Sequence, residues 1–252
     1  MAKEGKRRGA GSRRTPSGRS GTGRRGKAGA HGLPAAGSAG RQRPAPQSVP
    51  PAQAPPEAPR SFRLGAIPGA TPGKWIDAWR LRMPHVALEL VPISVADQRP
   101  ALEDLDAALV RLPIDDAGLH LIRLYDEIPV VVASAESHLA AADELDAADL
   151  RGEVLLPSIE DVLDVDVPGA TTPTFGPLPT TADVIATVAT GVGVAVVPLS
   201  LARLHHRKDV VHRPLRDGPT STVALAWPRE RTTADVETFV GIVRGRTANS
   251  SR

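Results

Sequence analysis

The chain has no cysteine and few aromatic residues. Its 252 residues include 0 Cys, and Phe, Trp and Tyr make up only 3%. The missing cysteine excludes disulfides, thiolate metal sites and cysteine nucleophiles, and the core must be built from Val, Leu, Ile and Ala. There is no run of about 18 apolar residues, so we predict no membrane span. No apolar segment follows the basic N-terminus, which argues against a secretory signal. We therefore expect a cytoplasmic protein.

Acidic residues are scarce at one end of the chain. Residues 1–60 hold 13 of the 31 Lys and Arg but only 2 of the 28 Asp and Glu. Residues 1–31 are rich in Gly, Ser and Arg, and residues 32–60 are rich in Pro and Ala. Such compositions bury too little apolar surface to offset chain entropy. We expect residues 1–60 to be a disordered tail, and residues 247–252 to be disordered as well.

The basic tail predicts a partner of its own. Its charge favours nonspecific, salt-dependent contact with DNA through residues 1–43, although a tail that only keeps the protein in solution is the alternative. No aromatic residue lies among the basic ones, so base stacking is not expected. The side chains expected to meet phosphate are Arg7, Arg8, Arg13, Arg14, Arg24 and Arg25.

A regular alternation begins at Ser61. Apolar runs predict strands at 63–68, 86–93 and 106–113. Between them, residues 71–84, with Thr71 as N-cap, and residues 96–105 are predicted to be helices. The order β-α-β-α-β implies a parallel sheet with helices on its faces.

The pattern then changes. Residues 118–136 read as one long extended passage with no room for a crossover helix, and residues 157–180 read as irregular. The remaining predicted elements are helices at 144–152, 182–190, 200–206 and 232–246, and strands at 152–157, 193–197, 210–215 and 221–228.

The stretch TADVIATVATGVGVAVVP, residues 181–198, contains Gly191-Val192-Gly193. Here a helix precedes the glycines and a strand follows them, the reverse of a dinucleotide-binding turn. We expect Gly191 to end the helix and Gly193 to ease entry into the strand. No spacing of His, Ser or acidic residues matches a known catalytic or metal-binding motif. We therefore predict no enzyme activity, no cofactor and no metal site.

Five segments together resemble the effector-binding domain of LysR-type transcriptional regulators. They are RLGAIPGAT with the following Trp-containing helix, RMPHVALELVPI, ALEDLDAALVR, LIRLYDEIPVVVASAESHLA and TADVIATVATGVGVAVVPLSLA. Each motif is weak alone, but the five keep the order and spacing of that family over residues 61–246. Asp104 stands where the family usually has Gly, and Ala140 where it has Pro after His138. The family's DNA-binding helix-turn-helix has no counterpart in residues 1–60.

The resemblance implies an α/β, type 2 periplasmic-binding-protein-like fold. Two α/β subdomains would be joined by crossover segments near residues 120–128 and 214–224. Subdomain I would span residues 61–122 and 221–246, and subdomain II residues 125–214. Isolated domains of this family commonly pair, so a homodimer is also expected.

The resemblance also implies a small-molecule effector, an organic acid or amide, in the cleft between the subdomains. Helix N-termini and strand ends there would supply N–H groups and hydroxyls. The alternative is that the hydroxyls only cap helices, and that Arg111 pairs with Asp115 or Asp116 rather than with a ligand. The residues expected to bind the ligand are Gly69, Ala70, Thr71, Ser94, Val95, Arg111, Ser158, Thr180 and Thr181.

Two other functions remain open from the sequence. The chain could be a cytoplasmic solute-binding module without a link to transcription. It could also be a nucleic-acid-associated protein that acts through its basic tail, with the folded part serving as a dimeriser.

Overall fold

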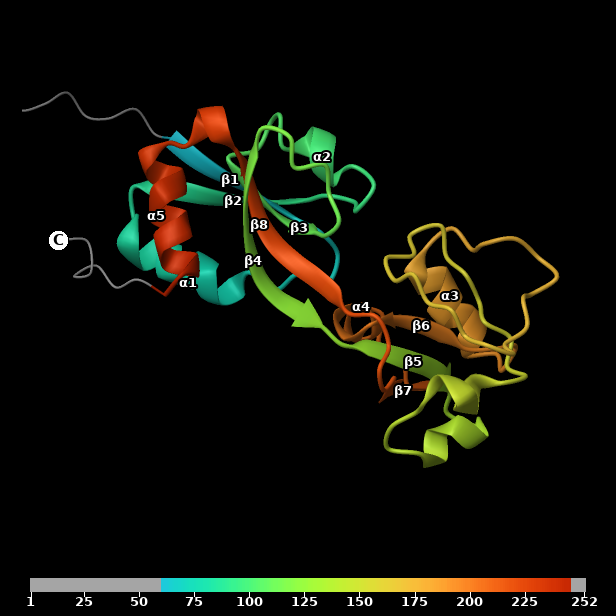
Figure 1. Cartoon of the computed structure of the whole chain (residues 1–252). Coiled ribbons are helices and arrows are strands. Elements are labelled where there is room, and N and C mark those ends of the chain that lie inside the picture. Colours follow the sequence, from blue (N-terminus) through green and yellow to red (C-terminus); the bar gives the residue numbers. More distant parts are fainter. Residues whose placement is uncertain (1–59, 246–252) are drawn as a thin grey trace, which may run out of the picture. The chain divides into compact units, whose positions relative to one another are not determined.

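The computed structural model describes residues 60–245, which belong to one compact unit. The predictions for the tail, Arg7 to Arg25 included, lie outside the described residues, as does that for residues 247–252. The described residues form two β-sheets with helices against them (Figure 1).

The first sheet has five strands. In spatial order they are β2 (Val86–Pro92), β1 (Arg60–Ala66), β3 (Ala107–Arg111), β8 (Ser221–Pro228) and β4 (Leu119–Glu127). β1 pairs in parallel with β2 and β3, as the β-α-β-α-β order predicts. β8 returns from the C-terminal part of the chain and pairs antiparallel with β3 and β4.

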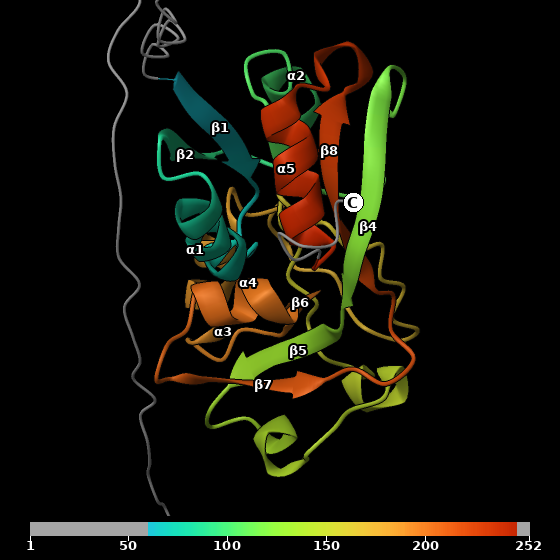
Figure 2. The same cartoon turned by 90° about the vertical axis from the view of Figure 1, so that its left-hand side faces the viewer.

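Alternating side chains give this sheet two apolar faces. Leu109 of β3 contributes to a core with Phe62, Trp79 and Phe239, whereas the neighbouring Val110 faces a second core around Leu102. Helices α1 (Gly73–Arg82) and α5 (Ala234–Val243) contact each other against the first of these faces (Figure 2). Three of the chain's few aromatic rings thus meet in one cluster.

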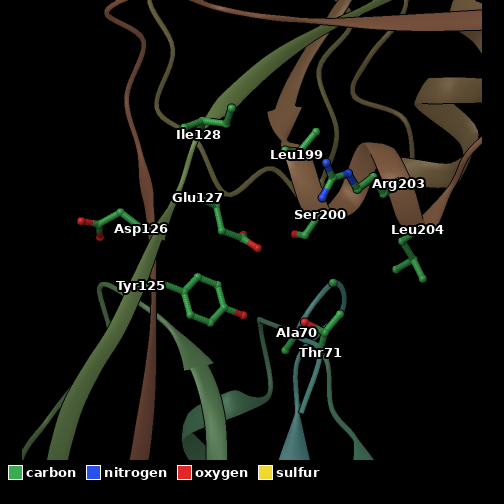
Figure 3. Close-up of a pocket in the computed structure, with 11 residues that line it drawn as sticks. Ala70, Thr71, Tyr125, Asp126, Glu127, Ile128, Leu199, Ser200, Arg203 and Leu204 are labelled. Atoms are coloured by element: carbon green, nitrogen blue, oxygen red, sulfur yellow. The ribbon is translucent and has the colours of Figure 1, made fainter. Parts of the chain in front are cut away.

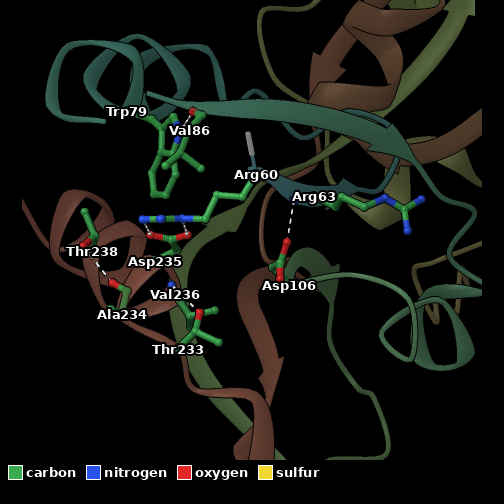
Figure 4. A network of polar contacts seen from close by, with 10 residues as sticks. All are labelled: Arg60, Arg63, Trp79, Val86, Asp106, Thr233, Ala234, Asp235, Val236 and Thr238. Atoms are coloured by element: carbon green, nitrogen blue, oxygen red, sulfur yellow. Dashed lines mark hydrogen bonds and ion pairs between the residues drawn. The ribbon is translucent and has the colours of Figure 1, made fainter. Parts of the chain in front are cut away.

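Polar contacts fix the ends of these elements (Figure 4). The Arg60 guanidinium lies 2.9 Å from Asp235 in the first turn of α5. The Trp79 indole N–H donates to the Val86 carbonyl at 2.9 Å. Thr233 caps α5 by accepting from the Val236 N–H at 3.3 Å. The Trp79 bond satisfies a buried indole N–H, and the Thr233 bond satisfies an N–H in the first turn of α5.

The second sheet has three strands, β6 (Ala195–Pro198), β5 (Pro129–Ser134) and β7 (Val210–Pro214), with β5 in the centre. β4 and β5 follow each other directly, so the passage 118–136 is extended as predicted and links the two sheets (Figure 1). Helices α3 (Thr181–Val188) and α4 (Leu199–Leu204) pack against one face of this sheet. The short 3-10 helices are η1 (His138–Ala141), η2 (Ala147–Leu150) and η3 (Arg229–Arg231).

Four local predictions are wrong. No α-helix forms at 144–152, where the structure has only the 3-10 helix η2. Residues 152–157 form only isolated bridges, from Val154 to Thr171 and from Leu155 to Val194, because no single segment pairs with them continuously. The helix expected at 96–105 shortens to α2 (Gln98–Ala101), because the following residues turn to bury Leu102 and Leu105. Thr71 does not cap α1: Pro72 occupies the cap position, and no side chain accepts a bond there.

The two glycines of the GVG stretch have the roles expected of them. Gly191 follows the end of α3 with a φ of +80°, a backbone conformation that glycine adopts without steric cost. A β-carbon at Gly193 would lie 2.2 Å from the Val154 carbonyl oxygen, so only glycine fits before β6. The stretch connects a helix to a buried strand and does not cradle phosphate.

Candidate functional site

A buried arginine lies where the two sheets are joined. Arg111, the last residue of β3, is only 2% exposed. Its Nη1 donates to the Glu127 carboxylate and to Ser221 Oγ, and its Nη2 donates to the Pro68 carbonyl at 3.3 Å. Glu127 ends β4 and Ser221 begins β8. Arg111 therefore ties together both segments that connect the sheets.

The predicted partner of Arg111 is corrected by this network. The carboxylate that it binds belongs to Glu127, not to Asp115 or Asp116, because the guanidinium turns inward from the end of β3. Gln98 holds the Arg111 backbone with two bonds of 2.8 Å, one to its N–H and one to its carbonyl. Arg111 Nε is buried and has no hydrogen-bond partner among the described residues.

A cavity of about 500 Å³ lies beside Glu127 (Figure 3). We call it the Glu127 cavity. Residues 69–71 and residues 125–128 form two of its walls, and Leu199, Ser200, Arg203 and Leu204 of α4 form the third. The cavity is therefore formed by the loop after β1, by the link between the two sheets and by helix α4, which packs against the second sheet. The predicted residues Gly69, Ala70 and Thr71 all line it.

Tyr125, the single tyrosine of the chain, stands in this cavity next to Glu127. Burial raises the pKa of its phenol, and the Glu127 carboxylate raises that pKa further. The charge of Arg111 and the hydrogen bond that the Thr71 N–H donates lower it. The net rise keeps Tyr125 protonated. A protonated phenol is a hydrogen-bond donor, so the Tyr125 O–H is able to donate to a ligand.

On the α4 wall two polar groups have no partner. Ser200 Oγ is buried without a hydrogen bond, and the Arg203 side chain makes no hydrogen bond or ion pair within residues 60–245. Figure 3 shows both on the side of the cavity opposite Tyr125 and Thr71. A β-carbon added to Gly69 would lie 2.4 Å from Ser200 Oγ, so the two walls touch at this point.

The start of α3 is differently arranged. Thr180 caps the helix by accepting from the Asp183 N–H at 3.1 Å, as the capping alternative predicts. The Thr181 N–H donates to Glu160 Oε2 at 3.0 Å, and Ser158 Oγ accepts from the Glu160 N–H at 3.1 Å. The chain's own Glu160 carboxylate therefore occupies the position where the sequence predicts a ligand's carboxylate.

A second cavity, of about 410 Å³, separates residues 111–113 and Val95 from residues 161–164. Burial raises the pKa of Asp161 there, and the neighbouring Asp164 adds to the rise. The N–H groups of Leu163 and Val162 act in the opposite direction. This Asp161 cavity contains two of the predicted residues, Val95 and Arg111, but its opposite wall is acidic.

The predicted site residues are thus divided among several places. Ser94 lines neither cavity, since its hydroxyl accepts from the Asp97 N–H at 2.9 Å. Ser158 and Thr181 border a space of only about 10 Å³, too small for a ligand. Four residues were missed: Tyr125, Glu127, Ser200 and Arg203. The signal for them was the segment LYDE between two apolar runs, and LSLAR directly after Pro198.

Within residues 60–245, no group of three or more His, Cys, Asp or Glu side chains is arranged to hold a metal ion. In the same part of the chain no helix is long and apolar enough to cross a membrane.

Comparisons with known proteins agree with this architecture. A family described as "LysR substrate binding domain" matches residues 57–248. The Hca operon transcriptional activator HcaR of Escherichia coli (strain K12) is 26% identical over 206 residues, which cover 75% of this chain and 69% of HcaR.

Two solved structures are similar in fold. The BenM effector binding domain with its effector benzoate has a TM-score of 0.60 and 18% identity, covering 74% of this chain and 91% of that one. The reduced form of the OxyR regulatory domain from Pseudomonas aeruginosa has a TM-score of 0.56 and 24% identity, covering 74% and 95%. The predicted type 2 periplasmic-binding-protein-like fold is confirmed.

Proposed function

Because the chain belongs to the LysR substrate-binding domain family, we propose that it senses a small effector molecule and passes this signal to the regulation of transcription. Members of this family are ligand-sensing domains rather than enzymes, which agrees with the lack of catalytic motifs in the sequence. The observation that carries the proposal is the Glu127 cavity, because its walls come from both sheets and from the link between them.

We propose a small organic acid or amide as the effector. Its carboxylate or carbonyl oxygen would accept from Arg203 and Ser200, the two polar groups of the α4 wall that have no partner. Guanidinium groups bind carboxylates with strong, charge-assisted hydrogen bonds. The opposite wall supplies Tyr125, whose O–H is free to donate.

The signal would be a change in the relative positions of two subdomains, from an open to a closed arrangement. We place subdomain I at residues 61–122 and 221–246 and subdomain II at residues 125–214. The strands β2, β3 and β8 and all but the first residue of β1 fall in the first range, the strands of the second sheet fall in the second, and β4 extends from the first range into the second. A ligand that touches Thr71 and Arg203 at once favours the closed arrangement over the open one, because only the closed arrangement provides both contacts. The network of Arg111 lies at the links that such a movement would bend.

Thiol-based redox sensing is excluded as the signal. Solved structures with a similar fold include an oxidized and a reduced form of OxyR. The 252 residues of this chain contain no cysteine that could be oxidised. Ligand binding is therefore the favoured input.

The partners of the protein follow from exposed residues. Leu81 on α1 is 86% exposed and Leu90 on the edge strand β2 is 46% exposed, and we propose that a second copy of the chain covers them as a homodimer. The basic residues 1–43 would contact DNA phosphates without sequence preference. Because contact with DNA requires access to it, we propose a cytoplasmic location.

A thermal-shift screen with small organic acids and amides tests the effector proposal. A ligand present at a hundredfold its Kd adds about 2.7 kcal/mol to the free energy of unfolding, so a binder raises the melting temperature clearly. If no compound of either class raises it, the proposal fails.

Deletion of residues 1–59 tests the role of the tail. The truncated protein should keep its ligand response and lose its salt-dependent DNA binding. DNA binding that survives the deletion would show that the folded part, not the tail, contacts DNA.

A further inference from the structure

We propose that the effector of the Glu127 cavity carries an ammonium group as well as a carboxylate, as an α-amino acid with an apolar side chain does. This inference rests on the proposed function and names the class of effector more closely.

We assign the ligand's carboxylate to the α4 wall, because the two other predicted sites for it are excluded. The helix start at α3 is not available, because the Glu160 carboxylate already accepts from the Thr181 N–H. Arg111 does not line the Glu127 cavity, and its Nη atoms already donate to Glu127, Ser221 and the Pro68 carbonyl. Arg203 and Ser200 remain, and both border the Glu127 cavity.

We assign the ligand's ammonium group to the opposite wall, beside the Glu127 carboxylate. Glu127 receives its bond from Arg111 on Oε2, and no described residue donates to its Oε1. Figure 3 shows this carboxylate pointing into the cavity between Tyr125 and Ser200. Glu127 is 8% exposed and lines the cavity, so its Oε1 is an acceptor that a ligand's donor can reach. An ammonium supplies three donors within a small volume.

The charges around the cavity favour a ligand that is neutral overall. Asp126 and Glu127 are negative, and Arg111 and Arg203 are positive, so the four groups balance. A plain carboxylate would add a negative charge near Asp126 and Glu127, and a plain amine would add a positive charge near the two arginines. A zwitterion adds neither and meets a complementary group at each end.

The remaining surface of the cavity is apolar. Ile128 is 47% exposed and Leu204 is 55% exposed, and both line the cavity with Leu199. An apolar ligand side chain would cover them. A volume of about 500 Å³ lies within the range of about 300–1,000 Å³ that is usual for small-molecule sites.

The single tyrosine makes the test direct. Full-length protein labelled with 13C at the tyrosine Cζ gives one NMR resonance, from Tyr125 in the cavity. The probes are the twenty standard L-amino acids, together with 4-methylpentanoate and 3-methylbutylamine, which are leucine without its ammonium and without its carboxylate. We expect at least one apolar amino acid to shift the resonance. For leucine, we expect binding at least tenfold tighter than that of either derivative.

The other outcomes separate this inference from the proposed function. If 4-methylpentanoate or another deaminated acid binds as tightly as its amino acid, the effector does not need an ammonium group. The inference is then wrong, but the proposed sensing function stands. If only the amine binds, the effector does not need a carboxylate, and its assignment to the α4 wall is wrong. If none of the probes, nor any compound of the acid and amide screen, shifts the resonance, both proposals fail.

A pair of arginine variants locates the carboxylate. Arg203→Gln should weaken amino-acid binding on the order of ten- to hundredfold, the usual effect of losing a hydrogen bond to a charged group. Arg207→Gln is the control, because Arg207 is exposed, pairs with Asp209 and lies outside the cavity. Equal amino-acid affinity in the two variants would show that Arg203 does not bind the ligand's carboxylate.

Discussion

Two carboxylates of the chain occupy positions where a ligand's carboxylate could bind, and they differ in burial. Glu127 is 8% exposed and neutralises Arg111 in the middle of a hydrogen-bond network. Glu160 is exposed and accepts one N–H at the start of α3. Breaking a buried ion pair leaves a charge without water, whereas an exposed carboxylate is exchanged for solvent at little cost. The first pair is therefore a fixed part of the fold, and the second is a contact that a competing anion can replace.

The largest expected effect comes from breaking the buried pair. Glu127→Leu leaves the Arg111 guanidinium uncompensated and should lower the free energy of unfolding by about 3–5 kcal/mol, as measured by urea denaturation. Glu144→Leu is the matched control, because Glu144 pairs with Arg216 at the surface and its loss should change stability far less. Combining Glu127→Leu with Arg111→Met should recover much of the loss, since no charge then remains buried. A double variant no more stable than Glu127→Leu would refute this explanation.

The next effect concerns the point where the two walls of the Glu127 cavity touch. Gly69 and Gly118 both have positive φ, of +83° and +74°, so alanine at either position should cost about 1–2 kcal/mol of backbone strain. Only at Gly69 would the new methyl group meet Ser200, while the space around Gly118 is open. Gly69→Ala should therefore cost about 1–3 kcal/mol more than Gly118→Ala in thermal unfolding. Equal losses would mean that the two walls do not touch in solution.

Much of the fold could be predicted from sequence because the signals were local. Apolar runs predicted most of the strands, and the helix predicted at 232–246 contains α5. Residues 152–157 failed because a strand also needs a continuous partner, and the sequence gives no hint of one. Only isolated bridges form there.

The site was less predictable, for two physical reasons. The register of β4 shifts between Arg123 and Tyr125, so its side chains do not alternate regularly between the two faces of the sheet. The sequence pattern therefore does not show which of residues 125–128 face the cavity. The start of α3 was read correctly as a helix N-terminus. Whether that terminus is free depends on Glu160, which lies 21 residues earlier in an irregular segment.

A smaller effect tests the exposed carboxylate. Glu160→Ala should lower the free energy of unfolding by about 0.5–1 kcal/mol, because the α3 N-terminus loses its anion. Added acetate should then restore part of the melting temperature, as it can occupy the freed Thr181 N–H. Chloride at the same ionic strength should not do so, and the unaltered protein should respond to neither salt. The Glu153→Ala variant, which leaves α3 intact, is the control. Acetate that stabilises all variants equally would argue against exchange at this position.

The smallest effect is a pH dependence that reports on Arg203. Burial lowers the pKa of His212, and the charges of Arg203, Arg213 and His206 lower it further. The unfolded chain then binds the proton more tightly, so this contribution to stability is complete above about pH 6.5 and declines as the pH falls toward the folded pKa. Replacing Arg203 with Gln removes one positive charge and should raise the pKa of His212, although not to its ordinary value, because burial is the larger cause. A carboxylate bound to Arg203 should raise that pKa in the same direction. NMR titration of the His212 ring, with and without the amino acid that shifts Tyr125, measures both changes. A pKa unaffected by Arg203→Gln would show that Arg203 does not act on this side of α4.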